Sequence, residues 1–133
     1  MSWDVSICRF GRQYETMEDI PNDERCYPLG TRLEIHAAIA RSFPGTDWSD
    51  PAWGVFESPF GSIEFSIGHE DPVEGVMLHV RASEAVVHPI IELCLGQEWQ
   101  ALDVSNGTFL EKSPVPEAGL RGWHEFKTRA LRQ

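Results

Sequence analysis

The chain has 133 residues, of which 41% are hydrophobic and 11% aromatic, enough for the core of one ordinary domain and too apolar for a disordered chain. Its net charge of −10 argues against nucleic-acid binding, which depends on clustered Lys and Arg. Residues 1–118 carry 7 basic and 20 acidic side chains, and residues 119–133 carry 4 basic and 1 acidic. We expect a single domain over residues 1–133, with an acidic body that attracts basic proteins and docks its own basic tail.

The sequence has no feature of a membrane or exported protein. Its apolar stretches, such as Ala85–Val87 and Pro89–Ile91, are far shorter than the ~20 residues that a bilayer span needs. The N-terminus lacks the basic region and apolar run of a signal peptide. Three cysteines cannot pair completely, so we expect reduced thiols in a cytoplasmic protein, with Cys8 and Cys94 as small core residues.

The first half of the chain predicts one strand, a loop and a helix. Trp3–Cys8 alternates apolar and polar residues, as in a half-buried strand. The polar stretch over residues 11–30 predicts a surface loop with one helical turn. Thr31, followed three residues later by a glutamate, matches a capping box and predicts a helix that Pro44 ends.

The second half predicts a hairpin followed by alternating strands and helices. Runs at 53–57 and 62–67 flank a four-residue turn, and residues 75–82 form a further strand with Val76, Leu78 and Val80 on its core face. The remaining predicted elements are a helix at 83–96, a strand at 99–104, a short return at 109–111 and a basic helix at about 119–131. The order β-α-β-β-β-α-β-α predicts an α+β fold with a mixed, mostly antiparallel sheet of about five strands and helices on one face.

No stretch carries the signature of an enzyme or a metal site. There is no G-x-S-x-G motif and no glycine-rich phosphate loop. No two of the five histidines stand at the i, i+4 spacing of a helical metal motif, and none pairs with cysteines at finger-like spacing. We therefore predict no catalytic residues, no metal and no cofactor.

The first candidate site is a segment over residues 44–54, rich in Gly, Pro and Asp, which predicts a loop with two tryptophans. Its Trp48 and Trp53 are either a lid that folds back on the core or anchors for a protein partner. In the second interpretation, carboxylates beside them meet Arg or Lys of a basic partner. The predicted partner-binding residues are Asp47, Trp48, Asp50, Trp53, Glu70 and Asp71.

The second candidate is the sheet face turned away from the predicted core. Strand alternation places Glu57, Glu64, His79 and Arg81 on that face. Three interpretations stay open for these residues: a solvated salt-bridged face, a polar surface for a partner, or a site for acid–base chemistry or a small molecule.

The segment Gln97–Leu110 contains a helix end, then Trp99 and Asp103 in a Trp-x-x-x-Asp pattern, then a Ser-x-Gly-x-Phe-Leu turn. With the preceding residues from Gly75, it resembles part of many small bacterial cytoplasmic α+β proteins. Some of these resemble immunity proteins of toxin–antitoxin systems, which neutralise a cognate toxin by binding it. The resemblance implies a fold and a binding role, and it carries over no functional residues.

These observations favour a non-enzymatic protein-binding domain, most concretely a bacterial immunity protein that neutralises a basic toxin by occlusion. The alternative is a small enzyme or small-molecule binder that uses the sheet face around His79 and Arg81. A third hypothesis is a homodimer that buries this face, with Met77 and Trp53 at its interface.

Overall fold

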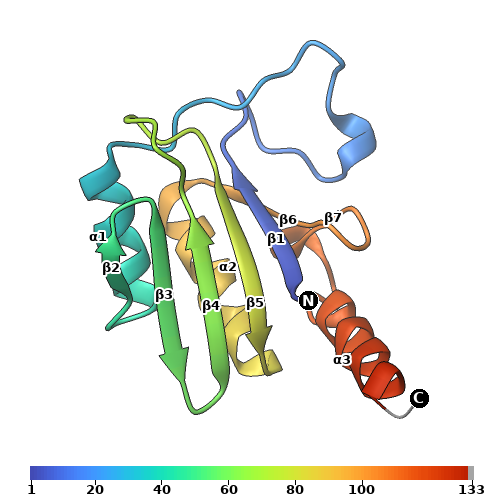
Figure 1. Cartoon of the computed structure of the whole chain (residues 1–133). Coiled ribbons are helices and arrows are strands. Elements are labelled where there is room, and N and C mark those ends of the chain that lie inside the picture. The colour runs from blue at the N-terminus through green and yellow to red at the C-terminus, as the bar shows by residue number, and fades with distance from the viewer. Residues whose placement is uncertain (132–133) are drawn as a thin grey trace.

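The computed structural model describes residues 1–131 and consists of one large sheet with helices (Figure 1). The sheet has seven strands in the order β2-β3-β4-β5-β1-β6-β7, and all neighbouring strands are antiparallel. The strands are β1 (Trp3–Cys8), β2 (Asp47–Asp50), β3 (Trp53–Ser58), β4 (Gly61–Ser66), β5 (Val76–Ala82), β6 (Gln100–Asp103) and β7 (Thr108–Phe109). The α-helices are α1 (Arg32–Ser42), α2 (Val87–Gln97) and α3 (Ala118–Leu131).

The core lies between the sheet and the two helices α1 and α2, which pass behind it in Figure 1. The first strand of the chain, β1, is an inner strand, and its Val5 and Ile7 are fully buried. Alternate residues of β5 and β4 join them, among them Leu78 and Ile63. The predicted core faces of these strands are therefore confirmed, and the α+β class with them.

Helix α1 begins where the sequence predicts, whereas α2 begins at Val87, after a 3-10 helix at Glu84–Val86 that follows the predicted start at Ser83. The Thr31 hydroxyl accepts from Glu34 N (3.2 Å) while Thr31 N donates to the Glu34 carboxylate (2.9 Å), so the predicted capping box is present at α1. Pro89 is the third residue of α2, within the first turn, where a backbone N–H has no partner inside the helix. The proline therefore costs α2 no hydrogen bond.

The predicted count of about five strands is wrong, because β2 and the short return predicted at 109–111 are the two edge strands of the sheet. The predicted mixed arrangement is also wrong, because every pair of neighbouring strands is antiparallel. Residues 47–50, predicted as part of a loop, form β2, and Thr108–Phe109 forms β7. An edge strand has one neighbour and little buried surface, so the Asp-Trp-Ser-Asp sequence of β2 shows no apolar alternation. The observed order is β-α-β-β-β-β-α-β-β-α, with every strand pairing antiparallel.

The basic C-terminal helix docks on the acidic body through its first half. Leu120 is fully buried, and the guanidinium of Arg121 donates two hydrogen bonds to the Glu84 carboxylate. His124 Nε2 donates to Ala82 O at the end of β5 (2.9 Å). Farther along α3, Phe126 and Arg129 are exposed. The fourth basic residue of the predicted tail, Arg132, lies outside the described residues.

A close approach of α3 to the sheet depends on one glycine. A Cβ added at Gly119 would lie 1.8 Å from Oδ2 of Asp103, a fully buried residue whose Oδ1 accepts from Ser105 N (2.9 Å). Because this short side chain is held, it cannot easily move aside. The backbone of α3 therefore reaches β6 only because residue 119 has no side chain.

Replacing Gly119 with alanine is expected to destabilise the protein by about 1–3 kcal/mol, because the new methyl group would overlap the Asp103 carboxylate. Gly122 lies in the same helix with nothing within 4 Å of an added Cβ, so Gly122→Ala is the matched control. The control is expected to stabilise the helix by about 0.5–1 kcal/mol. Urea unfolding measures both, and equal effects of the two substitutions would contradict the close approach.

Candidate functional site

Among residues 1–131, no α-helix lies over the face of the sheet opposite α1 and α2 (Figure 1), and we call this face the open face. Strand register determines which side chains share it. Asp4 of β1 is opposite His79 of β5, His79 is opposite Glu64 of β4, and Glu64 is opposite Val55 of β3. Directly opposed residues point to the same side of a sheet, so this row of four crosses the open face.

A second row lies beside the first and ends at the edge strand. Met77 is opposite Ser66, Ser66 is opposite Trp53, and Trp53 is opposite Asp50 of β2. In the same way Asp47 of β2 is opposite Val55. The structure therefore brings Trp53, Asp47 and Asp50 onto the same face as Glu64 and His79, which the sequence predicted as two separate sites.

Trp53 is held in one orientation by its neighbours. Its indole Nε1 donates to Glu64 Oε2 (3.1 Å), and its ring stacks on His79 with centroids 5.6 Å apart and an interplanar angle of 21°. Nδ1 of His79 lies 3.0 Å from Asp4 Oδ1, and Arg81 donates to the other oxygen of Glu64. The resulting network presents a fixed, half-buried aromatic ring at the centre of the open face.

The open face has a strong excess of negative charge. Its acidic side chains are Asp4, Asp47, Asp50, Glu57 and Glu64. Against them stands one arginine, Arg81. Asp47, Asp50 and Glu57 are exposed and take no part in the ion pairs formed within residues 1–131. Hydrogen bonds from the Ser49 hydroxyl and amide lower the pKa of the Asp47 carboxyl, so this group stays ionised at neutral pH.

Trp48 points to the opposite side of the sheet from Trp53. Its ring stacks on His36 of α1, with centroids 4.0 Å apart and an interplanar angle of 21°, and lies against the Gly54 backbone. His36 Nε2 also donates to Pro51 O (2.9 Å), which ties the β2–β3 turn to α1. This geometry favours the lid interpretation for Trp48, and it leaves Trp53 as the tryptophan that faces a partner.

Glu70 and Asp71 lie in the loop between β4 and β5, at one end of the open face. Ile67 N donates to Ala52 O (3.0 Å), so this loop adjoins the β2–β3 turn next to Asp50. The Asp71 carboxylate accepts from the backbone N of Arg32 (3.1 Å), whereas Glu70 is exposed. Asp71 is thus engaged at the start of α1, and Glu70 forms no ion pair within residues 1–131.

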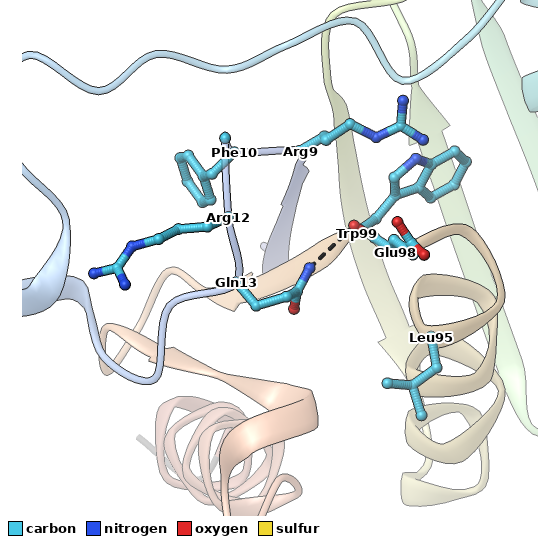
Figure 2. Close-up of a pocket in the computed structure, with 8 residues that line it drawn as sticks. Arg9, Phe10, Arg12, Gln13, Leu95, Glu98 and Trp99 are labelled. Carbon is cyan, nitrogen blue, oxygen red and sulfur yellow. Dashed lines mark hydrogen bonds between the residues drawn. The ribbon is translucent and has the colours of Figure 1, made fainter.

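A cleft of about 760 Å³ lies away from the open face, where the N-terminal segment passes the end of α2 (Figure 2). This volume is within the range of small-molecule sites. The cleft combines two guanidinium groups with apolar and amide side chains. Its lining residues are Arg9, Phe10, Gly11, Arg12, Gln13, Leu95, Glu98 and Trp99.

The walls of the cleft are joined by hydrogen bonds to backbone carbonyls. Arg9 donates to Pro28 O and to Gln97 O, both at 3.2 Å, and Gln13 donates to Glu98 O at 3.1 Å, the dashed line in Figure 2. Sequence reasoning missed this cleft because its two walls are more than eighty residues apart in the chain. No local pattern marks such a contact.

Within residues 1–131, no group of three or more His, Cys, Asp or Glu side chains is arranged to hold a metal ion. None of the helices in that range is both long enough and apolar enough to cross a membrane. Comparison with protein-family models, curated proteins and solved structures finds no significant match to this chain. Function is therefore inferred from the site itself.

Glu64→Ala is expected to lower the free energy of unfolding by about 1 kcal/mol, because Trp53 Nε1 and Arg81 both lose their acceptor. Glu57→Ala removes the same charge from the same face, where the side chain is exposed and unpaired within residues 1–131. This control is expected to stay within about 0.5 kcal/mol of the parent. Urea denaturation measures the free energy of unfolding of both variants. A loss for Glu57→Ala as large as the loss for Glu64→Ala would argue against the network.

Proposed function

We propose that this protein is a non-enzymatic binding domain that captures a basic protein partner on the open face of its sheet. The observation that carries the proposal is the position of Trp53, a fixed aromatic ring surrounded by carboxylates on a surface that no helix covers. Tryptophan is enriched at interface hot spots, where a rigid ring contributes large contact area at small entropic cost.

The surroundings of Trp53 fit a protein interface. Val55 and Met77 are its half-buried apolar neighbours on the face, and exposed carboxylates of β2 and β3 stand around them. An apolar centre with a charged rim is the usual anatomy of such interfaces. The rim would attract cationic side chains and accelerate encounter with a basic partner.

In its most concrete form, the proposal is a bacterial immunity protein that neutralises a cognate toxin by occlusion. Asp47 and Asp50 on the edge strand, with Glu70 and Asp71 at the adjoining rim, would pair with Arg or Lys side chains of the toxin. This form also draws on the resemblance of Gly75–Leu110 to small bacterial proteins, and it places the protein in the cytoplasm.

The two other hypotheses have less support. A small-molecule site around His79 and Arg81 would need free polar groups, but Arg81 donates to Glu64 and to Met1 O, and His79 contacts Asp4. Two clefts within residues 1–131, one of them beside α3, are lined by residues other than His79 and Arg81. A homodimer through the open face would bring two carboxylate-rich surfaces together, which like-charge repulsion disfavours.

The test begins with capture of a partner by the tagged protein from lysate of the native organism at low salt, followed by mass spectrometry. With the purified partner, Trp53→Ala is expected to raise the Kd at least tenfold, as for a hot-spot residue. The double variant Asp47→Asn with Asp50→Asn keeps the acceptors that Ser49 and Ala52 use and removes only the charge. It is expected to lower the association rate and its salt dependence, measured by surface plasmon resonance.

The matched control removes two carboxylates from the helix side, by Glu92→Gln with Glu98→Gln. Both residues are exposed, at α2 and just after its end, and neither is on the open face. This control is expected to bind like the parent. Binding that is lost in the control but retained in the open-face variants would overturn the proposal.

A further inference from the structure

The structure brings together two of the three cysteines. Cys8 is the last residue of β1, and Cys26 belongs to the segment 9–30 that follows it. This segment returns to the strand, where Arg9 and Tyr27 form an antiparallel bridge with Tyr27 N donating to Arg9 O (2.7 Å). Successive side chains alternate across such a ladder, so Cys8 and Cys26, next to the bridged pair, point to the same side.

The register of this bridge makes the two cysteines diagonal neighbours on the same side. Burial first, and then a side-chain hydrogen bond with Cys26, raise the pKa of the Cys8 thiol to about 12. Cys26 is exposed and Cys8 is half-buried, so an oxidant in solution reaches the pair through Cys26. Cys94 is fully buried, as predicted for a core residue, and Cys8 is more accessible than the sequence predicted.

We propose that Cys8 and Cys26 are a redox-sensitive pair that forms an intramolecular disulfide and thereby ties segment 9–26 to the end of β1. The co-reactant is a low-molecular-weight disulfide such as oxidised glutathione. This pairing replaces the expectation of three independent thiols, and it stands apart from the proposed function of the open face.

The reaction is a pair of thiol–disulfide exchanges. The Cys26 thiolate attacks one sulfur of oxidised glutathione, so a mixed disulfide forms and one glutathione thiolate leaves. Cys8 then loses its proton to solvent, and its thiolate attacks the Cys26 sulfur and displaces the second glutathione thiolate. In sum, two protein thiols are oxidised to one disulfide and one glutathione disulfide is reduced to two thiols.

Formation of the disulfide requires a small movement of the segment. Diagonal neighbours across a regular antiparallel ladder have Cα atoms about 7–8 Å apart, whereas a disulfide spans at most about 6.8 Å. Only one β-bridge pairs these two segments, and residues 24–26 have no regular secondary structure, so the segment around Cys26 can close the gap. Arg9, Phe10 and Gln13 of the cleft lie inside the loop that the disulfide closes, so oxidation fixes that wall of the cleft.

The test treats the purified reduced protein with oxidised glutathione and maps its peptides by mass spectrometry without reduction. We expect a cross-linked peptide pair containing Cys8 and Cys26, with no glutathione retained. The oxidised protein is expected to melt roughly 5–10 °C higher than the reduced one. Its backbone amides in residues 9–26 are expected to exchange more slowly with deuterium.

Three variants make the outcome specific, and the circular dichroism of each checks that it folds. Cys94→Ser is expected to form the same cross-link, whereas Cys8→Ser is expected to stop with glutathione on Cys26 and Cys26→Ser to remain unmodified. Cross-linking is expected to accelerate as pH rises, because the second step needs the Cys8 thiolate. Wild-type protein that keeps glutathione on Cys26, or that forms only intermolecular disulfides, would overturn the proposal.

Discussion

Helices α1 and α2 pack against the same face of the sheet, and the positions of the open-face side chains on β3, β4 and β5 depend on this packing. Fully buried side chains such as Val5, Leu78 and Ile63 must point toward α1 and α2. Because side chains alternate along a strand, a slip of one residue in register would expose these groups to water. The same constraint fixes the other face, so the positions of Glu64 and His79 are as strictly determined as those of the core.

Over β2 to β5 the open face is polar because it remains in contact with water, yet its side chains are not independent of one another. Glu64 accepts from both Trp53 and Arg81, and His79 contacts Asp4 while it stacks on Trp53. Mutual satisfaction of this kind holds an aromatic ring in place without burying it. A surface prepared in this way loses little conformational entropy on binding, which favours recognition of a macromolecule.

The N-terminal segment, residues 9–30, is held in place by contacts with distant parts of the chain. Tyr14 N donates to the side-chain oxygen of the buried Gln100, and the amide of that side chain donates back to Tyr14 O. Arg9 links the same segment to the end of α2. Apart from the short 3-10 helix at Met17–Asp19, these polar contacts hold the segment in place, and those of Arg9 join the two walls of the cleft.

The sequence by itself determined the α+β class, the capped helix at Thr31 and the inward and outward faces of β4 and β5. These features depend on local periodicity and capping, which neighbouring residues specify. The edge strand at Asp47 could not be predicted from the sequence, because an edge strand needs little apolar surface. Its formation depends on pairing with the neighbouring strand β3. Likewise, only the tertiary structure separated Trp48 from Trp53 and showed that Trp53 contacts Glu64 and His79. Side chains on different strands meet through register and packing, which are properties of the whole sheet and leave no local mark in the sequence.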